Sequence, residues 1–130
     1  MNVADVTQFA KQLRSGDEET QKQAAIALGK SGHPAALSPL VAALHDEKRS
    51  VRRAAQDSLI TLRDERAVEP LIEAAAEGRL DFNPVAYALE RKFGVADAYS
   101  RTWEAVQAYG DMDVIAAAKP LYERWLARQS

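Results

Sequence analysis

Apolar residues recur along the chain with the spacing of amphipathic helices, and the pattern repeats every 31 residues. Four apolar columns align at this shift, and in each copy they follow the i, i+3, i+4, i+7 spacing of one helix face. The columns are Val6, Leu37, Val68 and Tyr99; Phe9, Leu40 and Leu71, with Thr102 in the fourth copy; Ala10, Val41, Ile72 and Trp103; and Leu13, Leu44, Ala75 and Val106. Each repeat is therefore expected to contribute one such helix to a continuous core.

A second helix is expected in every copy. Ala24 and Leu28 lie 31 residues before Ala55 and Leu59, at the same helical spacing. In the third copy the register slips by one residue, and in the fourth the second helix contains Pro120. No segment has the two-residue alternation of a strand. The expected helices span residues 3–15, 18–29, 34–45, 50–62, 65–77, 83–93, 97–109 and 112–128.

Residues typical of helix ends lie between these segments. Asp17, His33, Ser50 and Asn83 are expected to act as N-caps. Five glycines fall where a left-handed residue commonly ends a helix, and these are Gly16, Gly32, Gly78, Gly94 and Gly110.

Two prolines and one glycine are expected to perturb the helices. Pro39 and Pro70 occupy the same position in consecutive repeats, where a missing backbone donor should bend the first helix. Gly29 lies near the end of a helix and is expected to shorten it.

Two stretches of the chain resemble the HEAT-repeat family, most closely its phycobilisome-lyase-like subtype of bacteria and archaea. They are Ser50–Leu59 followed by Asp64–Ile72, and Ala24–Lys30 followed by Ala36–Leu40. The resemblance implies an all-α fold, an α-α superhelix of about four helical hairpins whose second helices line the concave side. We expect one domain with repeats near residues 3–31, 33–62, 64–94 and 96–128, the last an atypical capping repeat.

Composition narrows the chemistry. The chain has 17 basic and 19 acidic residues, a net charge of −2, and no cysteine. Both histidines, His33 and His45, lie at expected helix ends, and no His-Glu pair or glycine-rich phosphate loop occurs. We therefore expect no catalytic residue, no metal site and no cofactor. No apolar run reaches the roughly 18 residues of a membrane span, and no signal peptide is recognised, so a cytoplasmic protein is expected.

Candidate binding residues lie on the second helices, away from the core stripe. They are Lys22, Ile26, Arg53, Gln56, Asp57, Tyr87, Glu90 and Arg91. Exposed apolar groups with a charged rim are typical of recognition surfaces. The alternative is that slightly rotated helices place Ile26 and Tyr87 in the core. The first hypothesis is a non-catalytic scaffold that binds another protein on its concave surface, itself a monomer or a weak homodimer.

A basic cluster, Lys48–Arg53, suggests a second hypothesis, nucleic-acid binding. We favour a structural role for the cluster, because acidic residues flank it and the net charge is negative. In that role Arg52 would pair with Asp17, Glu18 or Glu47. The family resemblance implies a third hypothesis, a bilin-lyase-type subunit or chaperone that acts on a tetrapyrrole-carrying protein.

Aromatic residues are concentrated in the second half of the chain. We expect them to form a bulky core that seals the end of the array, or alternatively a ligand pocket or an oligomer contact. They are Phe82, Phe93, Tyr99, Trp103, Tyr109, Tyr122 and Trp125.

Overall fold

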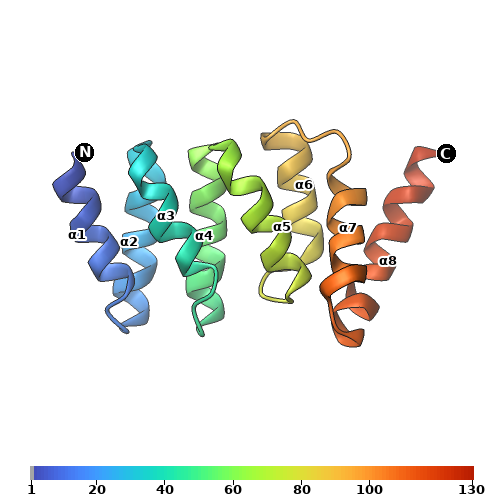
Figure 1. Ribbon diagram of the computed structural model, residues 1–130, viewed down its shortest axis with the longest axis horizontal. Coiled ribbons are helices and arrows are strands. Elements are labelled where there is room, and N and C mark those ends of the chain that lie inside the picture. Colours follow the sequence, from blue (N-terminus) through green and yellow to red (C-terminus); the bar gives the residue numbers. More distant parts are fainter. Residues whose placement is uncertain (1) are drawn as a thin grey trace. The chain divides into compact units, whose positions relative to one another are not determined.

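The computed structural model describes residues 2–130, and within that range it is all-helical (Figure 1). Eight α-helices and two short 3-10 turns make up this part of the chain, and it has no strand. The all-α fold class and the eight helices predicted from the sequence are confirmed. The chain folds into two compact units, Met1–Ala67 (unit 1) and Val68–Ser130 (unit 2).

Unit 1 holds two helical hairpins. The first consists of α1 (Val3–Leu13) and α2 (Glu18–Ser31), which pack on each other. The second consists of a 3-10 turn, η1 (Pro34–Ala36), with α3 (Leu37–Ala43) and α4 (Arg49–Leu62), and a further turn η2 (Glu65–Ala67) follows. Helices α2 and α4 pack side by side, and α3 lies nearer to the viewer than α4 in Figure 1.

Unit 2 holds the other two hairpins. Helix α5 (Val68–Ala76) packs on α6 (Phe82–Lys92), and α7 (Ala98–Tyr109) packs on α8 (Met112–Gln129). Helix α7 also packs on α5 and α6, so it lies at the centre of this unit.

The predicted apolar stripes form the cores of both units. Leu13, Leu44, Ala75 and Val106, which share one column, are all buried. Thr102, the polar exception, is fully buried, and its hydroxyl donates to the carbonyl of Ala98 at 2.7 Å. A polar residue is tolerated in this column because its own helix satisfies the hydroxyl.

The prolines begin helices, whereas we had predicted that they would bend them. Pro39 and Pro70 are each the third residue of an α-helix that follows a 3-10 turn. The first backbone N–H groups of a helix have no partner within the helix, so proline loses no hydrogen bond there. The predicted first helices 34–45 and 65–77 are therefore each divided into a 3-10 turn and a shorter α-helix.

Gly29 does not shorten α2, which continues to Ser31. Gly29 is buried against Ser58 of α4, and a Cβ at this position would lie 2.7 Å from the Ser58 Cβ. The Ser58 hydroxyl donates to the Ala25 carbonyl at 2.7 Å. The glycine therefore lets α2 and α4 approach closely.

Several predicted helix ends are confirmed. The Asp17 carboxylate accepts from the Thr20 backbone N–H at 3.0 Å, and His33 Nδ1 accepts from the Ala35 N–H at 3.0 Å. Four of the five glycines have a left-handed backbone, and these are Gly16, Gly32, Gly78 and Gly94.

Three predicted helix ends are wrong. Helix α4 begins at Arg49, one residue before Ser50, whose hydroxyl donates to Glu18 of α2. Asn83 lies inside the first turn of α6. Gly110 has an extended backbone with φ −79° and ψ 152°, because the chain leaves α7 in that conformation.

Candidate binding sites

The outer faces of α2 and α4 form a groove in unit 1. The hollow measures about 430 Å³, and four of the predicted binding residues line it, namely Lys22, Ile26, Arg53 and Asp57. Gly29, Ala54 and Ser58 also line this α2–α4 groove. Their small side chains leave the space open at the point where the two helices approach most closely.

Ile26 provides an apolar surface in this groove. Its side chain is 39% exposed, so the alternative that rotated helices place it in the core is wrong. Arg53 and Asp57 are also exposed and lie one turn apart on α4. The sequence prediction of an apolar group with a charged rim therefore describes the α2–α4 groove correctly.

The rim carries more positive than negative charge. Lys22, Lys30 and Arg53 line the groove, and Asp57 is the only acidic residue among the described residues that line it. The Arg53 Nε lies 3.7 Å from the Asp57 Oδ1, with both side chains more than half exposed. Exposed pairs of this kind contribute little to stability, so the Arg53 guanidinium can exchange this contact for one with a partner.

Gln56 does not belong to the exposed surface. Its side chain is 3% exposed, which corrects the prediction that it contacts a partner. Gln56 follows Ala55 on the side of α4 that faces the core, and Ala55 is fully buried. The helical phase places position 56 only one step from the buried stripe, and the packing of α4 decides that it is covered.

In unit 2 the three remaining predicted residues lie together on the exposed face of α6. Tyr87 is 52% exposed, so the alternative that it belongs to the core is wrong. The Arg91 guanidinium lies 5.7 Å from the centre of the Tyr87 ring, within the range of a cation–π contact. Glu90 is exposed beside them.

Unit 2 also contains a second, smaller hollow, which the sequence did not predict residue by residue. It measures about 200 Å³, and we call it the α8 hollow. Its lining comes from α6, α7 and α8, and consists of Asn83, Tyr99, Leu121, Arg124, Trp125 and Arg128. Only the concentration of aromatic residues in this half of the chain indicated a possible pocket here.

Stacked aromatic rings support this hollow. The rings of Tyr99 and Trp125 are nearly parallel, with centres 5.1 Å apart, and those of Trp103 and Tyr122 are also 5.1 Å apart. Phe82 meets Tyr99 edge-on at 6.0 Å. The predicted aromatic core is confirmed, and these rings pack against the buried residues of unit 2.

Tyr109 is the exception among these aromatic residues. Its side chain is 81% exposed at the end of α7, so the prediction that it joins the core is wrong.

Tyr99 is expected to ionise above the ordinary tyrosine pKa of about 10. Burial is the main cause of the raised pKa, and the negative charge of Glu90 adds to it. The folded state therefore favours the neutral phenol. This stabilisation is complete below the pKa of the unfolded state and is lost as pH rises through the higher folded-state pKa. An NMR pH titration of the Tyr99 ring carbons, assigned with Tyr99→Phe, measures the pKa, and a value below 10 would contradict the expectation.

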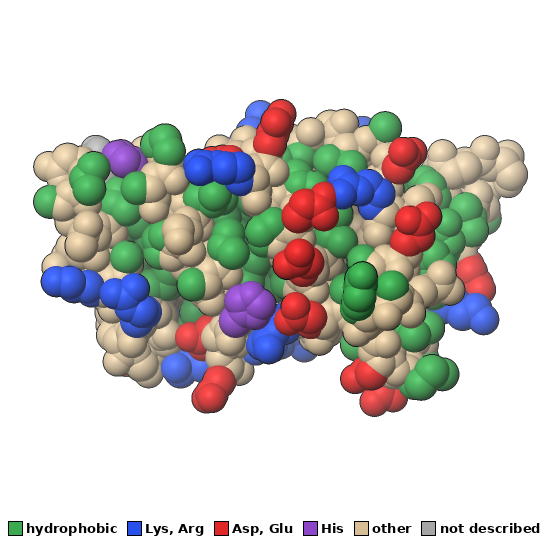
Figure 2. Space-filling model, viewed as in Figure 1, with side chains coloured by type: hydrophobic (Ala, Val, Ile, Leu, Met, Phe, Trp, Pro, Cys, Tyr) green, Lys and Arg blue, Asp and Glu red, His purple; other side chains and the backbone are tan. Residues whose placement is uncertain are grey.

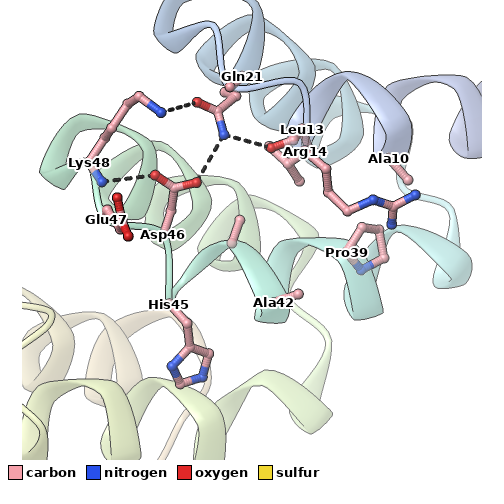
Figure 3. A pocket seen from close by; sticks show the side chains of 12 residues that line it. Ala10, Leu13, Arg14, Gln21, Pro39, Ala42, His45, Asp46, Glu47 and Lys48 are labelled. Atoms are coloured by element: carbon pink, nitrogen blue, oxygen red, sulfur yellow. Dashed lines mark hydrogen bonds between the residues drawn. The ribbon is translucent and has the colours of Figure 1, made fainter.

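A hydrogen-bond network links the two hairpins of unit 1 (Figure 3). The Gln21 side chain is buried, and its Nε2 donates to the Leu13 carbonyl at 2.8 Å and to Asp46 Oδ2 at 2.9 Å. Lys48 Nζ donates to Gln21 Oε1 at 3.0 Å, and the Lys48 backbone N–H donates to Asp46 Oδ1 at 2.8 Å. Figure 3 shows Arg14 extending toward Pro39, away from this network.

The basic cluster Lys48–Arg53 has structural contacts within unit 1. In addition to the Lys48 contact with Gln21, the Arg52 guanidinium donates to the carbonyls of Asp46 and Glu47 at 2.8 and 3.0 Å. We had expected Arg52 to pair with acidic side chains, and these backbone carbonyls are the partners seen instead. The contacts agree with the structural role that we favoured for the cluster.

Figure 2 shows the face of the molecule on which the first helices lie, with hydrophobic side chains over α1 and α3. It also shows acidic side chains in a row over α5. Glu69, Glu73 and Glu77 of α5 are exposed at four-residue spacing. Glu69 forms an ion pair with Arg101 of α7, and Glu77 accepts from Arg79 at 2.9 Å. Such a stripe is typical of a solvated helix face.

Within residues 2–130, no helix is both long and apolar enough to cross a membrane.

Antiparallel helix pairs that repeat about every 31 residues define an α-helical repeat protein. The family model for HEAT repeats matches residues 6–90, which is more than half of the chain. The chain therefore belongs to the HEAT-repeat family, whose repeats generally mediate protein–protein interactions. The phycobilisome-lyase-like subtype stays a prediction. A search of curated proteins finds no similar sequence.

Proposed function

We propose that this chain is a non-catalytic module that binds a partner protein through the α2–α4 groove. The observation that carries the proposal is the convergence of Lys22, Ile26, Arg53 and Asp57 on one hollow of about 430 Å³. An apolar side chain within a charged rim provides both burial and orientation for a bound segment.

The charge of the groove favours an acidic partner segment. Three cationic side chains, Lys22, Lys30 and Arg53, line it together with the single carboxylate of Asp57. A segment with carboxylates on either side of an apolar residue would place that residue on Ile26. Opposite charges at the rim of an interface raise the association rate and select the partner.

A double charge reversal, Lys30→Glu with Arg53→Glu, is expected to weaken partner binding about tenfold or more, because like charges would then face an acidic segment. Affinity capture from the native host identifies the partner. Titration of the purified partner against the wild-type and variant chains by isothermal calorimetry then measures the loss.

The matched control is Lys11→Glu with Lys92→Glu. Both of these lysines are exposed and lie in the last turn of a helix, and the pair changes the net charge by the same amount. Circular dichroism confirms that all variants keep the wild-type helix content. If both double variants bind the partner equally well, the α2–α4 groove is not the contact surface, and if nucleic acid is captured instead, the protein-binding proposal is wrong.

A further inference from the structure

The polar groups that remain available in the α8 hollow of unit 2 are hydrogen-bond donors. The Asn83 Oδ1 already accepts from the Tyr99 hydroxyl at 3.1 Å, which leaves the Asn83 amide N–H groups to face a ligand. Arg124 and Arg128 add guanidinium groups, which have only donors. None of the described residues that line the hollow carries a carboxylate.

The two arginines lie one helical turn apart on α8, so they project from the same face of that helix. Among residues 2–130, neither forms an ion pair or a hydrogen bond through its side chain, whereas Lys119 of the same helix pairs with Glu123 at 3.9 Å. Arg128 is near enough to the Tyr99 hydroxyl to lower its pKa, against the larger effect of burial. Two cationic groups without partners therefore border one small hollow.

The walls of the hollow are apolar and aromatic. Tyr99 and Trp125 stack with ring centres 5.1 Å apart and planes inclined by 8°, and Leu121 adds an aliphatic surface. Apolar walls reduce the access of water, which strengthens charge-assisted hydrogen bonds at the rim. At about 200 Å³, the hollow is smaller than the roughly 300–1,000 Å³ of pockets that enclose a drug-sized ligand, so it suits a single small group.

We propose that the α8 hollow binds an oxyanion, a phosphate or carboxylate group, attached to a small apolar group that packs on Trp125 and Leu121. Guanidinium groups match the planar carboxylate and the phosphate oxygens through paired N–H donors. The Asn83 amide supplies a further donor from α6. This site belongs to unit 2 and does not rest on the function proposed for the α2–α4 groove.

NMR titration of the whole chain tests the site with phenyl phosphate, inorganic phosphate and benzoate as probes. The indole N–H of Trp125, assigned with Trp125→Phe, is expected to shift in a saturable manner. The indole N–H of Trp103, which does not line the hollow, should move much less. Phenyl phosphate should bind more tightly than inorganic phosphate, because its ring adds contact with the apolar wall.

The decisive variant is Arg124→Gln with Arg128→Gln, which should weaken binding of phenyl phosphate about tenfold or more. Lys92→Gln with Lys119→Gln is the matched control, because it removes the same charge from residues that do not line the hollow. The control should bind within about twofold of the wild type, since distant exposed charges are screened by salt.

The probes also distinguish the two sources of the oxyanion. Saturable binding of phenyl phosphate alone would assign the site to phosphate groups, and binding of benzoate with comparable affinity would assign it to carboxylates. The proposal is overturned if no probe gives a saturable shift at Trp125. It is overturned equally if the arginine variant and the lysine control lose affinity to the same extent.

Discussion

Replacing Leu40 or Leu71 with alanine is expected to lower the free energy of unfolding by about 2–5 kcal/mol in each case. The two leucines occupy equivalent positions of consecutive repeats, one in each unit, and both are fully buried. Truncation removes buried methyl groups and leaves a cavity that the surrounding helices fill only in part. Urea unfolding followed by far-UV circular dichroism measures the change.

Val3→Ala is the control for this prediction. Val3 is also an aliphatic residue in a first helix, but its side chain is 60% exposed, so its truncation should change stability by less than about 0.5 kcal/mol. The assignment of the apolar stripe would be wrong if both leucine variants were as stable as the wild type.

Replacing Gly29 with alanine is expected to destabilise the chain by about 1–3 kcal/mol, the usual cost of overpacking. A glycine-to-alanine change at an unhindered helix position has the opposite sign and stabilises by about 0.5–1 kcal/mol. The sign differs here because the new methyl group would lie 2.7–2.9 Å from the Cβ, Cα and Oγ atoms of Ser58. Two of these atoms cannot rotate away, so α2 and α4 would have to separate.

A double-mutant cycle isolates this contact. In a Ser58→Gly background the side chain that meets the methyl group is absent, so Gly29→Ala should cost much less than in the wild type. Thermal or urea unfolding of the four chains gives the coupling energy. An equal cost in both backgrounds would mean that the close approach of Gly29 and Ser58 is not the cause of the destabilisation.

The sequence alone determined the helical repeat and most of the helix boundaries. The apolar stripe is a local property, because residues at i, i+3, i+4 and i+7 share a helix face whatever the helix packs against. The side-chain caps at Asp17 and His33 are local in the same sense. The pattern also indicated that Ile26, Arg53, Asp57 and Tyr87 lie away from the core, and all four are exposed.

Tertiary structure decided the features that depend on a neighbouring helix. Gly29 acts through its contact with Ser58, 29 residues later in the chain, and Asn83 is engaged by Tyr99 from another helix. Gln56 lies at the edge of the apolar stripe, where a small rotation of the helix decides between burial and exposure.

The two candidate sites show the same division. In the α2–α4 groove, the sequence identified the exposed residues because each helix face could be read separately, but the depth of the hollow comes from the small residues between the two helices. The α8 hollow needs side chains from three helices at once, and no spacing along one helix predicts that Asn83, Tyr99 and Arg128 meet. Helical periodicity reports which side of a helix is covered, whereas a binding site is formed by the surfaces that several helices leave uncovered together.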